Sequence, residues 1–481
     1  MPPYPEKLTR HLACPVGAGG LPDADVTGTA GAVACGDAVE IDLRISGGHI
    51  TDAGFRASGC GTALAAASAL CERVRGMDLI AAAALSAEQV GSDIGGMTDA
   101  QRHAADLVVD ALARGLERWY SGRLGSVGIP LDGRRVAVAM SGGVDSAVAA
   151  ERMIRAGHDV VGITMRLWHD PGAAAAERSC CSPETVQMAR RTAHALGIPH
   201  ITIDAAERFR VGVVESFVAG YRQGITPNPC VTCNGTVRFQ ILREFAALVG
   251  ARRFATGHYA RIVDGTIARA VDGAKDQSYM LARLDPGTVR RLELPLGDLV
   301  KRDVRAVARD LALPAAEAVE SQEVCFVGVG GYVPFLERYT GVGERTGPIV
   351  TTDGEHVGEH GGYWRFTIGQ RRGIGVSSDG PLYVVATDAA TNTVTVGSRA
   401  ELALHHLELE DVVTHEPLHD GALEVRVRYG GGALRGRARP TSSGLAVELV
   451  DPAGGVAPGQ TAALYRDGRL VAAGTIRRQD G

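Results

Sequence analysis

The chain has 481 residues, a mass of 50.2 kDa and a formal net charge of −5, and this length predicts about three or four domains. Hydrophobic residues make up 45% and charged residues 22%, which excludes a disordered or fibrous chain. No apolar run approaches the ~18 residues of a membrane span, and the chain begins without a secretion signal. We therefore expect a cytoplasmic protein without a membrane partner, whose nine cysteines are catalytic, metal-binding or buried rather than paired in disulfides.

Charge is unevenly distributed along the chain. Residues 1–125 carry 10 basic and 15 acidic side chains, whereas the remainder is neutral. A nucleic-acid surface would therefore have to be a local patch. Only three of the 50 basic residues are lysines. A retained lysine such as Lys275 can indicate a need for an ammonium group, although chance is the better explanation of this feature taken alone.

The first segment, residues 1–122, is expected to form an α+β domain. Residues 39–57 alternate and turn at Gly47-Gly48, which predicts a hairpin. Apolar spacing of three and four predicts helices over 61–77 and 99–120. The Gly, Pro and Ser content of residues 123–133 is typical of a linker.

From residue 134 strands and helices alternate, up to about residue 338. Strands are expected over 134–140, 158–168, 199–206 and 251–263, with helices between them. This alternation predicts a doubly wound, mostly parallel sheet, which binds ligands at the carboxyl ends of its strands. After about residue 340 only short strands and Gly-rich turns follow, including one expected within 361–375. They predict one or two small β domains, a central one over 339–400 and a C-terminal barrel over 401–481.

The string MSGGVDSAV lies where the first of these strands ends and a helix begins. Two glycines and a helix N-terminus allow backbone N–H groups to approach phosphates. The alternative is a tight turn with a capping serine. The string resembles the loop of the ATP-dependent adenylating enzymes, which release pyrophosphate and leave AMP on a substrate oxygen. That resemblance suits Asp145 to a magnesium–pyrophosphate and Ser141 and Ser146 to the phosphates, with Met165 of the second strand facing the adenine or simply part of the core.

The stretch TPNPCVTCNGTVRF contains Cys230 and Cys233, which we expect to lie just before a helix that starts after Asn234-Gly235. That position favours the reactive, metal-binding thiolate. Cys325 lies far away in sequence, in SQEVCFVG. A CxxC can also be a zinc half-site, but the chain has no second CxxC. Adjacent Cys180 and Cys181 are expected in the core or a loop.

Six strings occur in the order found in the bacterial tRNA-specific 2-thiouridylases, the MnmA family: SGGVDS, TPNPCVTCN, ATGHYAR, KDQSYML, SQEVCF and FTIGQRRGIG. The resemblance covers roughly residues 133–481. It implies ATP-dependent adenylation of the wobble uridine of tRNA, followed by sulfur transfer to its C2 position and loss of AMP. Sulfur would come from a cysteine desulfurase or another donor.

The resemblance also assigns roles to residues. Cys233 matches the nucleophile and Cys325 the cysteine that carries a persulfide. The residues expected to bind ATP are Ala139, Met140, Ser141, Gly142, Gly143, Val144, Asp145, Ser146, Met165 and Gly257. Those expected to bind tRNA or its target base are Asn228, Pro229, Cys230, Lys275, Asp276, Gln277, Arg428 and Tyr429.

The chain departs from the best-known members at Cys230, where they have an aspartate. The proton-handling assignment is therefore open, and three cysteines are available instead of two. Cys230, Cys233 and Cys325 would suit three corners of a 4Fe–4S cluster with one open iron. The competing interpretation keeps Cys233 and Cys325 as a persulfide and disulfide pair.

The strings ACGDAVEIDLRI and GCGTALAAASAL resemble iron–sulfur scaffold proteins of the NifU/IscU type. The resemblance implies iron ligands at Cys35, Asp37 and Cys60, a set that suits iron. The scaffold's His-Cys pair is His103-Ala104 here, so the ligand set is incomplete. His103 or Cys14 could complete it, or the domain could be retained only for docking.

Residues 424–439, EVRVRYGGGALRGRAR, predict a hairpin with an RNA surface. Arg426 and Arg428 are expected to share one strand face, and Arg435, Arg437 and Arg439 one face of the next. With Tyr429 they suit phosphates and a splayed loop, although a solvated barrel face explains alternating arginines as well. Arg371 and Arg372 are a second candidate patch.

Three functions are compared on these features. The leading one is an ATP-dependent tRNA sulfurtransferase with a built-in iron–sulfur or sulfur-delivery module. Another adenylating enzyme, such as an amidotransferase-type synthetase, would lack the CxxC and the β-domain strings. An iron–sulfur or sulfur carrier with a tRNA-binding C-terminal part would not need the intact SGGVDS loop.

Overall fold

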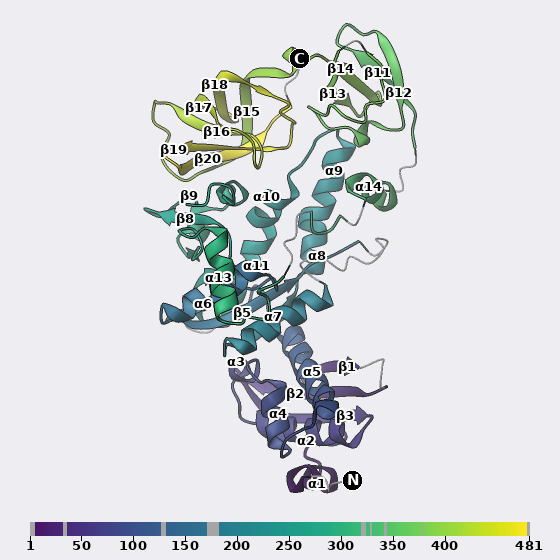
Figure 1. The fold of residues 1–481 in the computed structure, drawn as a ribbon, viewed down its shortest axis with the longest axis vertical. Coiled ribbons are helices and arrows are strands. Elements are labelled where there is room, and N and C mark those ends of the chain that lie inside the picture. Colours follow the sequence, from purple (N-terminus) through teal and green to yellow (C-terminus); the bar gives the residue numbers. More distant parts are fainter. Residues whose placement is uncertain are drawn as a thin grey trace.

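The computed structural model describes residues 5–31, 36–126, 131–170, 182–318, 324–327, 330–340, 344–378 and 380–478. Cys35, Cys180, Cys181 and part of the expected linker lie outside these ranges. Figure 1 shows an elongated molecule with the N-terminal α+β unit at one end, an α/β unit in the middle and two β units at the other end. The expected fold class is confirmed.

The N-terminal unit is a three-stranded antiparallel sheet covered by helices. Its strands, in the order β1-β2-β3, are β1 (Val26–Gly31), β2 (Ala38–Ser46) and β3 (His49–Ser58). Its helices are α1 (Glu6–Ala13), α2 (Gly61–Val74), α3 (Leu79–Ala82), α4 (Ala87–Asp93) and α5 (Arg102–Ser121). Alternating Val39, Ile41 and Leu43 of β2 are fully buried, which is why the hairpin could be read from its period of two.

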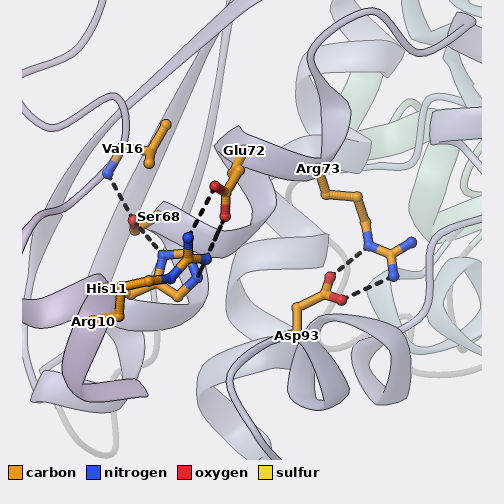
Figure 2. A network of polar contacts seen from close by, with 7 residues as sticks. All are labelled: Arg10, His11, Val16, Ser68, Glu72, Arg73 and Asp93. Carbon is orange, nitrogen blue, oxygen red and sulfur yellow. Dashed lines mark hydrogen bonds and ion pairs between the residues drawn. The ribbon is translucent and has the colours of Figure 1, made fainter. Parts of the chain in front are cut away.

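Polar contacts fix the surrounding helices to α2 (Figure 2). The buried ring of His11 lies 2.8 Å from Ser68 Oγ, and Ser68 Oγ also accepts a hydrogen bond from Val16 N. Arg10 pairs with Glu72, and Arg73 joins α2 to Asp93 of α4. Burial, and secondarily the charge of Arg10, lowers the pKa of His11. A neutral ring is therefore part of the contact between α1 and α2.

The middle unit is a five-stranded parallel sheet in the order β10-β7-β4-β5-β6. Its strands are β4 (Asp132–Ala139), β5 (Asp159–Arg166), β6 (His200–Asp204), β7 (Ala251–Ala255) and β10 (Leu292–Glu293). Its main helices are α6 (Val144–Arg155), α7 (Pro183–Ala195), α9 (Ser216–Arg222), α11 (Phe239–Leu248) and α13 (Lys301–Asp310). The chain moves from β4 to β5 and β6, then returns to β7 on the other side, so the strand order reverses between β4 and β7.

The N-terminal unit covers the open edge of this sheet at β6. The backbone N–H of His200 donates to Ala83 O at 3.2 Å, and Asp204 N donates to Ser121 Oγ at 2.9 Å. Arg190 of α7 pairs with Asp110 of α5 at 2.7 Å. An edge strand with unpaired backbone groups invites association with other chains, so this contact satisfies the edge within the same molecule.

Two β units follow the middle unit. The first is a four-stranded sheet, β12-β11-β14-β13, with β11 (Gly347–Thr351), β12 (His356–His360), β13 (Tyr383–Asp388) and β14 (Thr393–Gly397). The second is a closed six-stranded barrel, because β15 pairs with both β18 and β20. Its strands are β15 (Ala403–Thr414), β16 (Leu423–Arg426), β17 (Leu434–Thr441), β18 (Gly444–Gly454), β19 (Thr461–Arg466) and β20 (Arg469–Ile476).

Two expected elements are wrong. Residues 251–263 form two strands rather than one: β7 ends at Ala255, and β8 (Ala260–Val263) starts after a loop that contains Gly257. Strand β8 pairs with β9 (Thr266–Arg269) beside the barrel. Residues 361–375 form no strand, and they contain a short turn of 3-10 helix at Tyr363–Arg365. The reason is that glycines with positive φ, such as Gly369 at 87°, interrupt the extended backbone.

Candidate active site

The SGGVDS loop connects β4 to α6 at the carboxyl edge of the sheet. Gly142 has a φ of 75°, and a Cβ there would lie 2.5 Å from Thr185 O, so only glycine fits. Ser146 Oγ accepts a hydrogen bond from Ser141 N at 3.0 Å and donates to Gly143 O at 3.0 Å. Ser146 is buried and holds the turn together, whereas Ser141 is exposed.

Gly257 follows the end of β7 and contacts this loop across the point where the strand order reverses. A Cβ at Gly257 would lie 2.8 Å from Asp145 C and 2.9 Å from Ser146 N. Met165 lies half-buried near the end of β5, beside β4. The structure thus brings the expected ATP residues to one edge of the sheet, at the position where open α/β sheets bind ligands.

Asp145 is held by two residues that the sequence did not single out. Lys301 Nζ lies 2.7 Å from both carboxylate oxygens, and Tyr259 OH donates to Oδ1 at 2.7 Å. The Lys301 side chain is 11% exposed and Asp145 32%. The scarcity of lysine in the sequence is a signal that points to Lys301 as well as to Lys275.

Cys230 and Cys233 are the second and fifth residues of a helix, which corrects the expectation that they precede it. Helix α10 (Pro229–Cys233) continues through a π-helical turn, Asn234–Arg238, into α11. Asn228 caps it by accepting a hydrogen bond from Val231 N at 3.2 Å. The reason is local: proline suits the first helical position because the helix needs no N–H there.

The three cysteines differ in exposure. Cys230 is exposed, Cys233 is buried and Cys325 is intermediate. Cys233 belongs to the main apolar core, and Cys325 packs against the same core. Phe326, next to Cys325, lies edge-on to three aromatic rings at 5.3 to 5.7 Å between centroids. Cys325 is therefore anchored beside a rigid aromatic cluster.

A compact group of possible metal ligands lies in the N-terminal unit. Donor atoms of Asp37, Cys60 and His103 all lie within 4.8 Å of one another. Asp37 is buried and accepts a hydrogen bond from Cys60 N at 3.1 Å, while His103 Nε2 lies 3.5 Å from its other oxygen. A Cβ at Gly59 would lie 2.2 Å from Asp37 Oδ1. Among the residues that the structure describes, Cys14 is exposed and lies outside this group. Cys230, Cys233 and Cys325 also lie outside it.

The expected tRNA residues from the middle unit and the barrel lie together, with different roles. Burial raises the pKa of Tyr429, and the positive charge of nearby Lys275 opposes that shift. Asp276 is buried and accepts hydrogen bonds from Ala270 N, Ser278 N and Ser278 Oγ. A carboxylate satisfied in this way positions backbone and does not face RNA.

Gln277 also positions backbone. Its side-chain Oε1 accepts a hydrogen bond from Tyr259 N at 2.9 Å, and its backbone N–H donates to Tyr259 O at 2.7 Å. These contacts fix the residue whose hydroxyl binds Asp145. Gln277 therefore links the RNA side of the site to the nucleotide loop.

The arginine hairpin is confirmed only in part. Arg426 ends β16 and is half-buried, 3.1 Å from Glu424 and 3.6 Å from Asp276. It holds the barrel to the middle unit and does not share an exposed face with Arg428, which lies beyond the strand. The arginines of β17 do share an exposed face, namely Arg435, Arg437 and Arg439. Arg371 and Arg372 are also exposed.

No helix in the described ranges combines the length and the apolar character that crossing a membrane requires. Family models match four successive regions: a NifU-like N terminal domain over residues 3–125, a tRNA methyl transferase HUP domain over 134–329, a tRNA methyl transferase PRC-barrel domain over 334–398 and an aminomethyltransferase beta-barrel domain over 404–476.

Whole-chain relatives agree with these matches. The chain is 41% identical to the bifunctional protein NifU/MnmA of Rubrobacter xylanophilus, over 99% of each chain. It is 44% identical to the tRNA-specific 2-thiouridylases MnmA of Sorangium cellulosum and Mycolicibacterium smegmatis, over 72% of this chain and 93% and 100% of theirs. A NifU-like unit, an ATP loop on a parallel sheet and two β units in one chain have the same order as in the first of these relatives, and the chain belongs to the bifunctional NifU/MnmA family.

Proposed function

We propose that the chain is an ATP-dependent tRNA sulfurtransferase that converts the wobble uridine to 2-thiouridine. The observation that carries this proposal is the close packing of Gly257 on the SGGVDS loop at the switch point of the sheet, where an added Cβ would lie 2.8 Å from Asp145 C. The chain is similar over 99% of its length to a bifunctional NifU/MnmA protein and over 72% to a 2-thiouridylase. Such a loop is suited to hold a nucleoside triphosphate for adenylation.

In the first step, backbone N–H groups of the loop and the N-terminus of α6 would hold the phosphates. Lys301 and Asp145 place a positive and a negative group side by side. A half-exposed carboxylate fits a magnesium ion, which would neutralise the phosphates, and the ammonium group would bind a phosphate oxygen. The uridine O2 attacks the α-phosphorus, the bond to the bridging oxygen breaks, and pyrophosphate leaves.

In the second step, sulfur arrives as a persulfide on Cys325. The thiolate of Cys233 attacks the inner sulfur and forms a disulfide. The hydrosulfide that is released attacks C2, and the bond from C2 to the AMP oxygen breaks. A dithiol reductant then restores both thiols, and a cysteine desulfurase or another donor resupplies sulfur.

A 4Fe–4S cluster on Cys230, Cys233 and Cys325 is a second candidate for this step. One observation favours it: Cys230 and Cys233 are three residues apart in one helical turn, so their side chains lie on neighbouring positions of the same face. Thiolates are the usual cluster ligands, so the donor set fits. When bound, the cluster would supply an open iron position for sulfide. Retention of full thiolation by Cys230→Ser after anaerobic reconstitution would count against it.

The RNA is proposed to bind between the middle unit and the barrel. Lys275 and Tyr429 approach each other there, and the exposed arginines of β17 continue the surface. The barrel also contacts the segment before α10, because Gln460 Nε2 donates to Thr226 O at 2.7 Å. RNA that touched the barrel would therefore reach the cysteine helix directly.

The N-terminal unit is proposed to bind iron or another metal through Asp37, Cys60 and His103, with Cys35 as a further candidate. Helices α2 and α10 lie on opposite sides of the central sheet (Figure 1). His103 is near the start of α5, whose 20 residues extend about 30 Å, while the end of α5 contacts β6. We therefore propose that sulfur or cluster delivery occurs between two chains.

The experiment is a paired assay on the purified chain with tRNA, ATP and a sulfide source. Pyrophosphate release and 2-thiouridine content are measured together. Equal amounts of both products would support the proposal. If the purified chain contains metal and binds tRNA but forms neither product, the result would instead favour the interpretation as an iron–sulfur or sulfur carrier protein.

A further inference from the structure

A pocket lined by arginines lies at the end of the central sheet opposite the nucleotide loop. Its volume is about 470 Å³, and its lining residues are Leu131, Gly133, Arg252, Arg253, Arg290 and Arg291. These residues lie within the first three residues of β4 and β7, or immediately before β4 and β10. Because the three strands are parallel, the pocket is at their amino edge, about 23 Å from the carboxyl end of β4 at 3.3 Å per residue.

Most of this positive charge is not neutralised by the protein. Arg253 pairs with Glu293. Arg252 and Arg290 are exposed, and within the described ranges no ion pair or hydrogen bond engages their guanidinium groups. A cluster of like charges without acidic partners destabilises the folded chain, so it points to an anionic ligand.

Arg291 gives the second, independent observation. Its Nε donates to Arg252 O at 2.9 Å, and its guanidinium carbon lies 5.8 Å from the centre of the Phe254 ring. Its Nη2 is buried and has no hydrogen-bond partner in the described chain. Burial, then the positive charges of Arg243 and Arg252, lowers the pKa of this group. The positive charges of Arg243 and Arg252 therefore act at the wall of the pocket, where they favour an anion.

Phosphate is the anion that this geometry fits best. Guanidinium groups present a planar set of donors that bind phosphate oxygens in pairs, and the concave shape can enclose a backbone phosphate with its sugar. We propose that this pocket, defined by Arg252, Arg290 and Arg291, binds a phosphate of the RNA backbone and so forms a second contact for the tRNA, remote from the nucleotide loop. The inference rests on the proposed function for the identity of the RNA.

The test is the double variant Arg252→Gln/Arg290→Gln, measured for tRNA affinity without ATP across a range of salt concentrations. Both side chains are exposed, so the fold should be retained; thermal melting checks this. The matched control is Arg102→Gln/Arg114→Gln in the N-terminal unit, where both arginines are also exposed and the same charge is lost.

Each lost phosphate contact should make the plot of log affinity against log salt concentration less steep by about 0.7–0.9. It should also reduce the affinity at ~0.15 M salt about fivefold. The control should keep the wild-type slope. Saturating tRNA should restore thiolation by the pocket variant, because the nucleotide loop is intact. Arg291→Lys, which keeps the charge but loses the fork, should also weaken tRNA binding.

Several outcomes would overturn the inference. Wild-type tRNA affinity and salt slope in the pocket variant would refute an RNA contact. If that variant also lost inorganic phosphate binding, measured by phosphorus NMR, the pocket would belong to a free phosphate; if it lost poly-glutamate binding, to an acidic protein surface. A wild-type chain that bound no tRNA would overturn the proposed function, and this inference with it.

Discussion

Replacing Gly257 by alanine tests whether the contact between β7 and the nucleotide loop positions ATP. The new Cβ would lie 2.8 Å from Asp145 C and 2.9 Å from Ser146 N, whereas ordinary contacts begin at about 3.4 Å. Both neighbours are backbone atoms, so no side chain can rotate away. The loop must therefore move by about 0.6 Å.

That displacement sets the expected magnitude. Overpacking of this kind costs about 1–3 kcal/mol of stability. A misplacement of about 1 Å can reduce the rate of a positioned reaction roughly 100-fold, so a shift of half that size should slow adenylation about tenfold. Binding of tRNA should not change, because Gly257 packs on the nucleotide loop and is not among the residues assigned to the RNA surface.

The assay is tRNA-dependent pyrophosphate release at varied ATP concentration. Gly273→Ala is the matched control, because a Cβ there meets no atom within 4 Å. Wild-type KM for ATP and wild-type pyrophosphate release by Gly257→Ala would refute the role assigned to this contact. Equal slowing by Gly273→Ala would show that the assay reports a nonspecific effect.

Three further predictions concern the sulfur, RNA and metal sites. Cys233→Ala or Cys325→Ala should lose thiolation while tRNA-dependent pyrophosphate release stays measurable; full thiolation by either variant would contradict the assignment. Arg428→Gln/Arg437→Gln should reduce tRNA affinity about fivefold per lost contact and flatten its salt dependence, and an unchanged slope would mean a solvated barrel face. His103→Ala should lower the metal content of the purified chain by elemental analysis, and unchanged content would exclude this ligand.

Delivery between chains has its own test. The Cys60→Ser and Cys233→Ser variants are mixed in a reaction that depends on the N-terminal unit as sulfur source. Because one chain keeps the donor site and the other keeps the nucleophile, thiolation should return on mixing. No recovery from two folded, metal-analysed variants would contradict delivery between chains.

Local patterns in the sequence predicted the regular parts of the fold. The period of two in β2 and β3 and the alternation of strands with helices from β4 to β7 come from burial of one or both strand faces. Strand β1 was missed because VTGTAG has little hydrophobic contrast. The start of α10 was also missed, although Asn228-Pro229 is a cap followed by the favoured first residue.

The site was harder to predict, because several roles depend on contacts between distant segments. Asp276 was itself expected to bind tRNA, but the barrel residue Arg426 and three local donors make it structural. Lys301 lies 156 residues from Asp145 and meets it only because α13 packs beside α6. No spacing rule within either segment could indicate that pair.

The central claim is that ATP cleavage at the SGGVDS loop drives sulfur transfer to tRNA. The most direct measurement is a single-turnover reaction with labelled ATP, sulfide and tRNA, followed by nucleoside analysis of the RNA. The account predicts one pyrophosphate and one AMP for each 2-thiouridine at the wobble position, and neither product without tRNA. Release of ADP, or 2-thiouridine formed without ATP, would contradict it.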